Sequence, residues 1–239
     1  MTEELKKINH LAIIMDGNRR WARKNGKSVK DGHREGAERL SNTIDWCIEF
    51  GIKYLTVFAF STENWKRDSS EINDIMALLR HYLKSKEKDF NKKGIRVRAI
   101  GVEDGVDRDI LESIRKIEAD TENNNILCLN VAFNYGGRRE IVDATKKISQ
   151  MVKDGLLKIE DINEDVFKTK LYYGDIPDPD LIVRTGGEFR ISNFLLWEMA
   201  YAELYFDDAL WPDFSKELLI KIINNFKKRE RRYGGTVQK

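Results

Sequence analysis

The sequence has few prolines and cysteines and no long apolar run. Three prolines and two cysteines occur in 239 residues. Cys47 and Cys128 lie in separate apolar segments without a paired metal-ligand spacing, which predicts buried thiols in a reducing compartment and argues against a zinc site. No apolar run approaches the ~20 residues of a membrane-spanning helix, and the first residues lack the apolar core of a signal peptide. We therefore expect a cytoplasmic protein.

A charge excess of one sign is also missing, since 42 Lys and Arg residues stand against 40 Asp and Glu residues. Proteins that bind nucleic acid through a strongly basic surface have an excess of Lys and Arg over Asp and Glu, so no nucleic-acid partner is expected. A site for an anion must then come from the local placement of a few cations. Hydrophobic residues make up 41% of the chain, which can supply a real core. We expect one domain spanning residues 1–239, because no linker, repeat or low-complexity segment divides it.

Six short apolar segments rich in β-branched and aromatic residues are predicted to be strands. They cover residues 10–15, 52–60, 95–101, 126–133, 181–185 and 203–206. Apolar residues at helical spacing lie between several of them, with stops at Gly51 and Gly94 and near Gly155, and a last helix is expected from Phe214 to Arg232. This alternation predicts an α/β fold, a mainly parallel six-stranded sheet flanked by helices.

The chemistry-bearing residues directly follow the predicted strands. Asp16-Gly17-Asn18-Arg19-Arg20-Trp21 follows the first strand, "STENWKR" the second, "NYGGRRE" the fourth and "RTGGEFRISN" the fifth. Because parallel strands end at one edge of the sheet, these segments should meet there. Arginine forks and helix-start amides fit phosphate oxygens, and carboxylates together with phosphates suit magnesium. The sequence therefore predicts a pyrophosphate site at this edge.

Several residues allow two interpretations. Asp16 is either the N-cap of a helix or part of a metal or anion site. His33 is either a surface residue at a helix start or a group that handles a proton or bonds a phosphate. Trp21 and Trp65 either pack in the interior or wall a pocket. "WARKNGKS" ends like a P-loop, but Trp21 stands where that motif requires its first glycine.

Together these segments resemble the cis-prenyltransferase family, whose bacterial type is undecaprenyl diphosphate synthase. The matching segments are "HLAIIMDGNRRWA", "GHREGA", "FAFSTENWKR", "FNYGGRREI", "RTGGEFRISNFLLWEMAYAELYF", "WPDF" and "RERRYGG", in family order from His10 to Gly235. The Asp-Asp-x-x-Asp motif of trans-type prenyl synthases is absent. The resemblance implies an enzyme that joins isopentenyl diphosphate to an allylic diphosphate, farnesyl or geranylgeranyl diphosphate, using Mg²⁺. Its expected product is a long Z-polyprenyl diphosphate such as undecaprenyl diphosphate, held in an apolar tunnel.

The resemblance also implies roles for particular residues. Asp16 and Asn64 are expected at the reacting centre, and Asp16 and Glu203 as magnesium carboxylates. The isopentenyl diphosphate clamp corresponds to Arg184, Arg190 and Ser192. The remaining substrate-binding positions are Gly17, Asn18, Arg19, Arg20, Trp21, His33, Ser61, Glu63, Trp65, Arg67, Arg232 and Gly234. In these dimers Arg232-x-Gly234 reaches the partner's site, so a homodimer is expected.

Some points stay open at this level. The proton acceptor could be Asn64, His33, Asp16 or the diphosphate itself. The primer and the product length are undetermined, and a shorter-chain synthase or a non-catalytic partner subunit are alternatives. An arginine that bacterial members often carry after the Gly-Lys pair is replaced by Val29 or Lys30, so one diphosphate contact is in doubt. The apolar product implies transient contact with a membrane surface.

Overall fold

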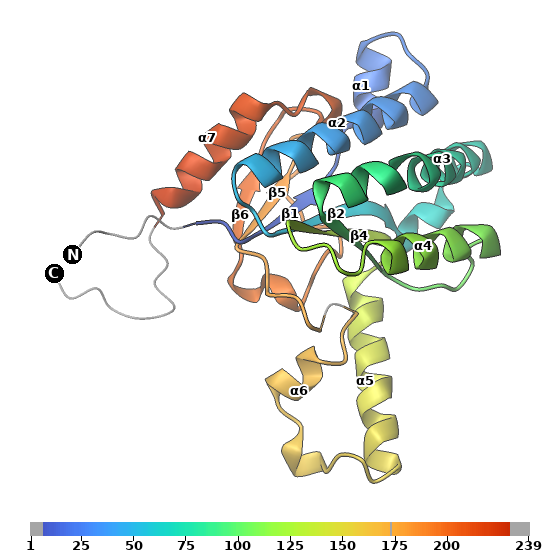
Figure 1. Cartoon of the computed structure of the whole chain (residues 1–239), viewed down its shortest axis with the longest axis vertical. Coiled ribbons are helices and arrows are strands. Elements are labelled where there is room, and N and C mark those ends of the chain that lie inside the picture. Colours follow the sequence, from blue (N-terminus) through green and yellow to red (C-terminus); the bar gives the residue numbers. More distant parts are fainter. Residues whose placement is uncertain (1–6, 173, 230–239) are drawn as a thin grey trace, which may run out of the picture.

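One parallel sheet organises the chain. The computed structural model describes residues 7–172 and 174–229. Six strands lie in the order β3-β4-β2-β1-β5-β6, and each neighbouring pair runs parallel. They are β1 His10–Ile14, β2 Tyr54–Ser61, β3 Ile95–Ile100, β4 Leu127–Tyr135, β5 Leu181–Arg184 and β6 Glu203–Phe206. The predicted six-stranded α/β fold is therefore confirmed (Figure 1).

Seven α-helices occur within the described residues, namely α1 Asn18–Lys24, α2 Val29–Glu49, α3 Ser69–Lys93, α4 Arg108–Asp120, α5 Gly137–Lys153, α6 Glu164–Lys168 and α7 Lys216–Lys227. Short 3-10 segments are η1 Thr62–Lys66, η2 Ile159–Asp161, η3 Glu198–Tyr201 and η4 Trp211–Asp213. The long helices match the predicted apolar periodicity. The sequence did not predict α6 or the 3-10 segments, which are too short for such a pattern. The predicted end of the last helix, Arg232, lies outside the described residues.

Local capping chemistry explains where the helices begin and end. Ser28 caps α2 in a capping box, because its hydroxyl accepts from the Asp31 amide at 3.1 Å while the Asp31 carboxylate accepts from Ser28. Gly94 closes α3 with φ 66°, a left-handed conformation in which glycine lacks the usual steric penalty. Gly51 follows the end of α2 with φ 72°. The glycine stops predicted from the sequence are confirmed.

The two faces of the sheet are covered differently. On one face, α2, α3, α4 and α7 pack through buried residues such as Ile44, Phe90, Ile117 and Ile222 against the central strands. The other face packs mainly against non-helical chain, including the buried Phe194 and neighbouring residues. The predicted flanking helices are therefore distributed unequally between the two faces of the sheet. The side chains that enclose the main core come chiefly from one helical layer.

The strand order places a crevice between β1 and β5. From β1 the chain continues to β2 on one side, and from β5 it continues to β6 on the other. In parallel α/β sheets the carboxyl ends of two such adjacent strands border a ligand crevice. Asp16 comes two residues after β1, and Arg184 is the last residue of β5. The topology thus brings together two residues that are 168 positions apart.

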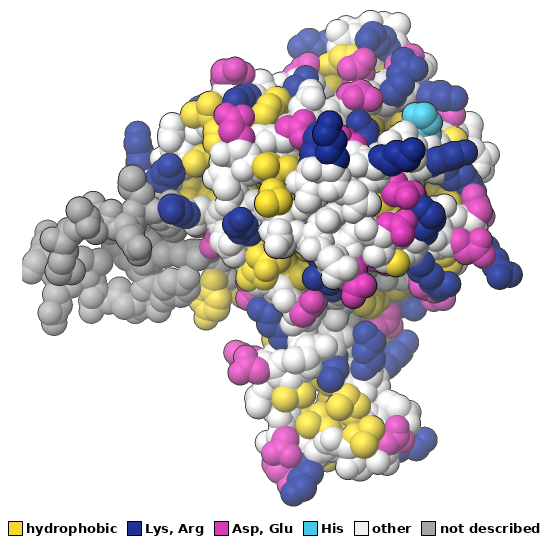
Figure 2. Space-filling view, viewed as in Figure 1, with side chains coloured by type: hydrophobic (Ala, Val, Ile, Leu, Met, Phe, Trp, Pro, Cys, Tyr) yellow, Lys and Arg dark blue, Asp and Glu magenta, His cyan; other side chains and the backbone are white. Residues whose placement is uncertain are grey.

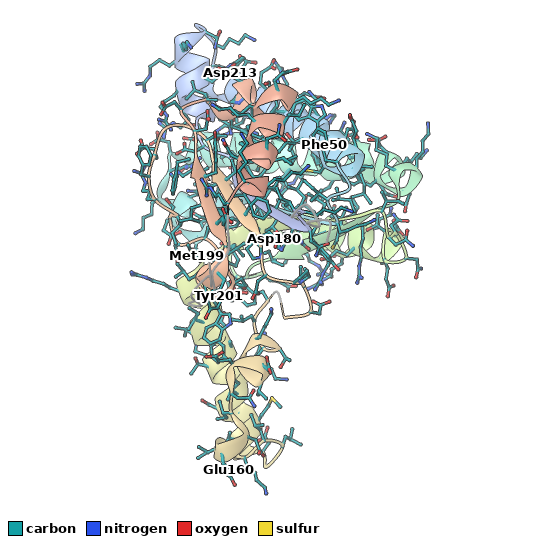
Figure 3. All side chains as sticks on the ribbon, turned by 90° about the vertical axis from the view of Figure 1, so that its left-hand side faces the viewer. Phe50, Glu160, Asp180, Met199, Tyr201 and Asp213 are labelled. Atoms are coloured by element: carbon teal, nitrogen blue, oxygen red, sulfur yellow. The ribbon has the colours of Figure 1, made fainter. Side chains whose placement is uncertain are left out.

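Helices α5 and α6 form an arm that projects from the sheet (Figure 1). Apolar side chains gather at the far end of the arm (Figure 2), and Glu160 lies at its tip (Figure 3). The exposed apolar residues there are Leu156 and Ile159, 73% and 72% exposed, and Ile162. Exposed large apolar side chains that gather in one place are a common feature of contact surfaces.

Two buried acids lie where the arm joins the sheet. Glu140 of α5 accepts hydrogen bonds from the Tyr135 hydroxyl and, at 2.8 Å, from the Tyr172 amide. Glu198 is 1% exposed, and neither carboxylate oxygen has a hydrogen-bond partner among the described residues. Burial, and then the charge of Glu140, raise the pKa of Glu198 to about 8. Glu198 is therefore mostly protonated at neutral pH.

This pair makes stability depend on pH. A carboxyl whose pKa is higher in the folded than in the unfolded chain stabilises the fold below the unfolded value, and that contribution is lost as pH rises through the folded value. The melting temperature of the wild type should decrease as the pH rises from 6 to 9. The melting temperature of Glu198→Gln should decrease less. At pH 9 the variant should melt at least ~3 °C higher, roughly 1 kcal/mol for a chain of this size.

Differential scanning calorimetry across this pH range tests the prediction. Glu122→Gln, at an exposed position, is the matched control and should follow the wild type. Parallel pH curves for Glu198→Gln and the wild type would show that the Glu198 carboxyl does not titrate in this window.

Candidate active site

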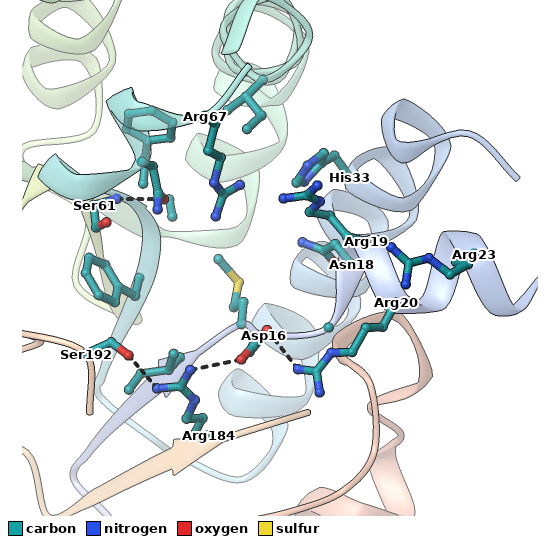
Figure 4. A pocket seen from close by; sticks show the side chains of 18 residues that line it. Asp16, Asn18, Arg19, Arg20, Arg23, His33, Ser61, Arg67, Arg184 and Ser192 are labelled. Atoms are coloured by element: carbon teal, nitrogen blue, oxygen red, sulfur yellow. Dashed lines mark hydrogen bonds and ion pairs between the residues drawn. The ribbon is translucent and has the colours of Figure 1, made fainter. Parts of the chain in front are cut away.

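The carboxyl ends of β1, β2 and β5 border a cavity of about 590 Å³ (Figure 4). It collects most of the residues that the sequence placed at this edge, which confirms their proximity. The lining residues include Asp16, Gly17, Asn18, Arg19, Arg20, Arg23, His33, Ser61, Asn64, Arg67, Arg184 and Ser192. Apolar residues of β1, β2 and α3 complete the wall.

Asp16 is held by two arginines and does not cap a helix. Gly17 occupies the N-cap of α1 with φ 119° and no side-chain cap bond. The Asp16 carboxylate instead pairs with Arg184 Nη2 at 2.9 Å and with Arg20 Nη2 at 3.1 Å. A Cβ on residue 17 would lie 2.9 Å from Leu210 Cα, which adds a steric reason for glycine. The N-cap interpretation of Asp16 is therefore wrong.

Arg184 connects Asp16 to the loop after β5. Its side chain is only 5% exposed. Nη1 donates to the Arg190 carbonyl at 2.5 Å and to Ser192 Oγ at 2.7 Å, and Nη2 donates to the Asp16 carboxylate. A buried guanidinium with this set of partners is fixed in orientation. Ser192 thus lies at the cavity, as predicted.

Helix α1 reaches the cavity because two glycines of α2 let it approach. A Cβ on Gly32 would lie 2.4 Å from the Asn18 carbonyl oxygen, and one on Gly36 would lie 2.5 Å from Asn18 Oδ1. The contact at Gly32 is with backbone and leaves no room for a Cβ, whereas a Cβ at position 36 would displace the Asn18 side chain from its place against α2. This close packing sets Asn18, Arg19 and Arg20 at the mouth of the cavity.

A buried glutamate on α3 organises the opposite wall. Glu71, whose side chain is 7% exposed, contacts Arg67 Nη1 at 3.0 Å, His33 Nε2 at 3.2 Å and Arg19 Nη1 at 3.6 Å. Burial lowers the pKa of His33, although the hydrogen bond and charge of Glu71 oppose the shift. The surface interpretation of His33 is wrong. Sequence reasoning missed Glu71, for which its spacing of four residues from Arg67 was the available signal.

The cavity carries a local excess of positive charge. Five arginines line it, Arg19, Arg20, Arg23, Arg67 and Arg184, together with one acid, Asp16. Two further acids, Glu71 and Glu188, contact some of these arginines from outside the lining, so the arginines outnumber the nearby acids by two. Arg23 was not among the predicted site residues, although it follows Arg20 by three positions and shares its helix face. Because the whole chain is nearly neutral, this excess is a property of the site. It suits a ligand with several negative oxygens.

Ser61 and Asn64 lie at the end of β2. The Asn64 side-chain oxygen accepts from the Ser61 amide at 3.1 Å, which closes the first turn of η1. Both residues line the cavity, as predicted. Val29 and Lys30 do not line it, since Val29 is 37% exposed and Lys30 pairs with Asp74 at 3.2 Å. Neither residue therefore substitutes for the missing arginine in this structure, whereas Arg19 and Arg23 do reach the cavity.

Four predicted substrate-binding side chains lie outside this cavity. The indole of Trp21 donates to Asp213 at 2.7 Å, and that of Trp65 donates to Asn134 at 2.8 Å. Both tryptophans therefore fix neighbouring elements. Glu63 accepts from Asn193, and Arg190, 59% exposed, pairs with Glu188. The predicted positions Arg232 and Gly234 lie outside the described residues.

Glu203 does not meet Asp16 within this chain. It is the first residue of β6 and pairs in register with Leu181, whereas Arg184, beside Asp16, pairs with Phe206. Three residues of strand correspond to roughly 10 Å, so Glu203 lies toward the opposite edge of the sheet. There it pairs with Arg229 at 3.1 Å. Residues 7–172 and 174–229 contain no group of three or more His, Cys, Asp or Glu that could hold a metal ion.

A second, apolar cavity of about 150 Å³ lies between the sheet and α2, α3 and α4. It shares six lining residues with the charged cavity, namely Met15, Asn18, His33, Ala59, Phe60 and Ile75. Its deeper wall is almost wholly apolar and includes Leu83, Phe90, Val97 and Leu129. A charged compartment and a hydrocarbon-like compartment therefore share a wall.

Comparison with known proteins identifies the family. Residues 14–234 match the family model described as "Putative undecaprenyl diphosphate synthase". An isoprenyl transferase from Fusobacterium nucleatum is 49% identical over 226 residues, 95% of each chain. A tritrans,polycis-undecaprenyl-diphosphate synthase (geranylgeranyl-diphosphate specific) from Pyrococcus abyssi is 47% identical over 94% of this chain and 86% of that protein.

Solved structures agree with these relatives. Lavandulyl diphosphate synthase from Lavandula x intermedia, in complex with dimethylallyl diphosphate, superimposes with a TM-score of 0.92 at 34% identity, covering 95% of this chain and 98% of that one. A probable undecaprenyl diphosphate synthase from Campylobacter jejuni gives 0.79 at 36% identity, covering 96% and 99%. The fold and the site thus define a prenyltransferase enzyme. The chain belongs to the undecaprenyl diphosphate synthase family, as its resemblance to the cis-prenyltransferases predicted.

Asp16→Ala tests the centre of the site. Removing the carboxylate takes away the group that orients Arg184 and Arg20, and we expect turnover in prenyl transfer to fall at least ~100-fold, as for loss of one major electrostatic group. The chain should still fold, because the Asp16 carbonyl keeps its bonds from Thr185 Oγ1 and the Trp211 amide.

Steady-state kinetics and circular dichroism provide the measurements. Asp45→Ala, which removes an exposed acid of α2, is the control and should behave like the wild type. Wild-type turnover by Asp16→Ala would remove this carboxylate from its assigned role.

Proposed function

We propose that this prenyltransferase condenses isopentenyl diphosphate units onto farnesyl or geranylgeranyl diphosphate and releases a long Z-polyprenyl diphosphate. Undecaprenyl diphosphate, a precursor of a glycosyl carrier lipid, is the expected product. The observation that carries the proposal is the shared wall between a cavity with five arginines and an apolar cavity. A diphosphate with a hydrocarbon tail needs a positively charged environment for its oxygens and an adjoining apolar environment for its tail.

The allylic diphosphate is assigned to the side of the cavity formed by α1 and α3. Arg19, Arg20 and Arg67 point their guanidinium groups toward this space (Figure 4). When the allylic carbon–oxygen bond breaks, negative charge develops on the departing diphosphate. Arginines already held in place by Asp16 and Glu71 stabilise that charge without reorganisation.

Isopentenyl diphosphate is assigned to the side formed by β5 and its loop. Arg184 and Ser192 are already oriented there by their mutual hydrogen bond. Arg190 lies on the same loop, and its exposed guanidinium can turn toward a bound diphosphate if it leaves Glu188. The double bond of this substrate then attacks the allylic carbon, and a proton leaves the resulting cation.

Several groups border the place where that proton is lost. His33 lines both cavities, and burial lowers its pKa, which favours the neutral imidazole that a proton acceptor requires. Asn64 and Asp16 also line the charged cavity, and the diphosphate oxygens would lie beside them. These four remain the candidate acceptors.

Mg²⁺ is the proposed cofactor. Magnesium in proteins is commonly held by one or two carboxylates together with substrate phosphates, and Asp16 at the cavity wall supplies one carboxylate of this kind. Bound there, the ion would neutralise part of the diphosphate charge. Because Glu203 lies toward the other edge of the sheet, it would have to act on an ion held by another copy of the chain.

A homodimer is proposed on the basis of the arm. Its exposed apolar residues Leu156, Ile159 and Ile162 favour contact with a second apolar surface, and the identical arm of another copy offers one. Sedimentation analysis would then give about twice the chain mass of 27.9 kDa. A partner subunit without chemistry of its own is less consistent with Asp16, Arg20 and Arg184 all in place at one cavity.

The apolar cavity is proposed to be the start of the product tunnel. Its small lining residues Ala37 and Ala59 leave room beside the charged cavity, where an elongating chain would enter. None of the helices in the described residues is long and apolar enough to cross a bilayer. We propose a cytoplasmic enzyme that contacts the membrane surface only to release its lipid product.

Incorporation of labelled isopentenyl diphosphate tests the function. With Mg²⁺ and primers of ten, fifteen or twenty carbons, we expect a ladder of products that ends at a long chain, because each product is also a primer. Chelator should abolish incorporation, and added Mg²⁺ should restore it. A ladder that stops after one or two additions would establish a shorter-chain synthase, and no incorporation with any primer would contradict the proposal.

Ala59→Leu tests the tunnel. Leucine at this point of β2 would occupy space that the two cavities share, so products should become shorter by at least one isopentenyl unit while incorporation continues. Chain lengths are read by chromatography after removal of the diphosphate. Ala119→Leu, on the exposed side of α4, is the control. Unchanged product lengths in Ala59→Leu would place the growing chain elsewhere.

A further inference from the structure

The loop after β5 approaches the site in an unfavourable backbone conformation. Ser192, Asn193 and Leu195 have φ values of 50°, 65° and 45°. This left-handed region penalises residues with a Cβ, and asparagine tolerates it better than most. A loop with several such residues keeps its shape only if contacts with other segments hold it. Asn193, the residue best suited to the conformation, makes those contacts.

Asn193 satisfies the first amides of α5 from a different part of the chain. Its carbonyl accepts from the Gly137 amide at 2.8 Å, and its Oδ1 accepts from the Arg138 amide at 2.9 Å. The N-cap residue of α5, Gly136, has no side chain to do this. The amides that a helix leaves unpaired at its start are therefore capped by the loop that carries Ser192.

The same side chain also reaches η1. Asn193 Nδ2 donates to Glu63 Oε1 at 2.9 Å, and Glu63 is the neighbour of Asn64. One amide group thus joins the loop after β5, the start of the arm helix and the segment after β2.

The paired glycines of "NYGGRRE" make room for this junction. A Cβ on Gly136 would lie 2.7 Å from Thr62 Oγ1 and 2.8 Å from Asn193 Nδ2. A Cβ on Gly137 would lie 2.8 Å from Leu196 Cγ. The glycines do not line the charged cavity. Their role in this structure is the close approach of three segments.

We propose that Asn193 is a positioning residue for isopentenyl diphosphate. It fixes the backbone of Ser192, whose hydroxyl accepts from Arg184 Nη1, and Arg184 in turn holds Asp16. Loss of the junction allows Ser192 to rotate and leaves Arg184 with one partner fewer. This assignment rests on the proposed function, because it presumes that Arg184 and Ser192 receive this substrate.

The contacts also specify which substrate is affected. Within the described residues Asn193 forms hydrogen bonds with η1 and α5 but none with α1, where Arg19 and Arg20 face the other side of the cavity. Binding of isopentenyl diphosphate should therefore weaken while binding of the allylic substrate is kept. If the residue contributed only to fold stability, its substitution would change the affinities for both substrates or for neither.

Asn193→Asp isolates the bond to Glu63. The new carboxylate still accepts from the Arg138 amide and still tolerates the left-handed conformation, but it opposes the carboxylate of Glu63. We expect the Kd for isopentenyl diphosphate, measured by titration calorimetry without primer, and its KM to rise about ten-fold, which is within the range for coupled neighbours. The Kd values for farnesyl and geranylgeranyl diphosphate should change less than about two-fold.

A second substitution supplies the rescue. In Asn193→Asp combined with Glu63→Gln, the glutamine amide can donate to the aspartate, so the bond returns with its direction reversed. Most of the lost affinity should return, with Glu63→Gln alone as the reference of the cycle. Asn163→Asp, the same change at the N-cap of α6, is the matched control, since Asn163 accepts from the Val166 amide far from the cavity.

The outcomes separate this inference from the proposed function. If the wild type neither binds isopentenyl diphosphate nor elongates a primer, the proposed function fails and the inference with it. If the wild type does both, an unchanged Kd in Asn193→Asp, equal losses for both substrates, or no recovery in the double variant each overturn the inference alone. Should Asn193→Asp fold poorly, Asn193→Gly keeps the left-handed conformation, removes both side-chain bonds and must weaken isopentenyl diphosphate selectively.

Discussion

The ion pair between Asp16 and Arg184 is the interaction on which the site depends. It joins the ends of β1 and β5 at 2.9 Å and gives the buried Arg184 guanidinium its compensating charge. Arg184 is buried whereas the Asp16 side chain is 28% exposed, so the carboxylate stabilises the guanidinium and both positions are constrained together. Arg20 extends the pair toward α1, and Ser192 extends it toward the loop after β5. The residues assigned to the two diphosphates are thus connected through one carboxylate.

Close backbone approach is the second constraint. Gly32 and Gly36 let α1 rest on α2, while Gly136 and Gly137 let the loop after β5 meet α5 and η1. Neither pair contributes a functional group. Each removes the volume of a side chain at a point where two segments must nearly touch, and the polar groups of the cavity acquire their positions as a result. Glycine in these motifs acts through packing.

The sequence was sufficient for the sheet and for most of the cavity, because strand periodicity and parallel topology together determine which residues share an edge. The sequence was less informative about which individual side chains are buried. Trp21 and Trp65 follow strands just as the cavity residues do, but only their partners, Asp213 and Asn134, reveal that they face away. Glu71 was missed, because its spacing of four residues from Arg67 does not show that it is buried against His33 and Arg19. Glu203 is the first residue of β6, at the end of the strand opposite to the cavity, and its expected magnesium role came only from the family resemblance.

The long separation between Asp16 and Arg184 has a consequence for synthesis on the ribosome. β1 and β2 emerge early and can pair, but the other edge of β1 stays open until β5 has left the exit tunnel, about 170 residues later. Contacts of such high sequence separation form late and slowly. The nascent chain therefore carries an unpaired edge and a lone carboxylate for most of its synthesis, and the charged cavity is complete only when translation is nearly finished.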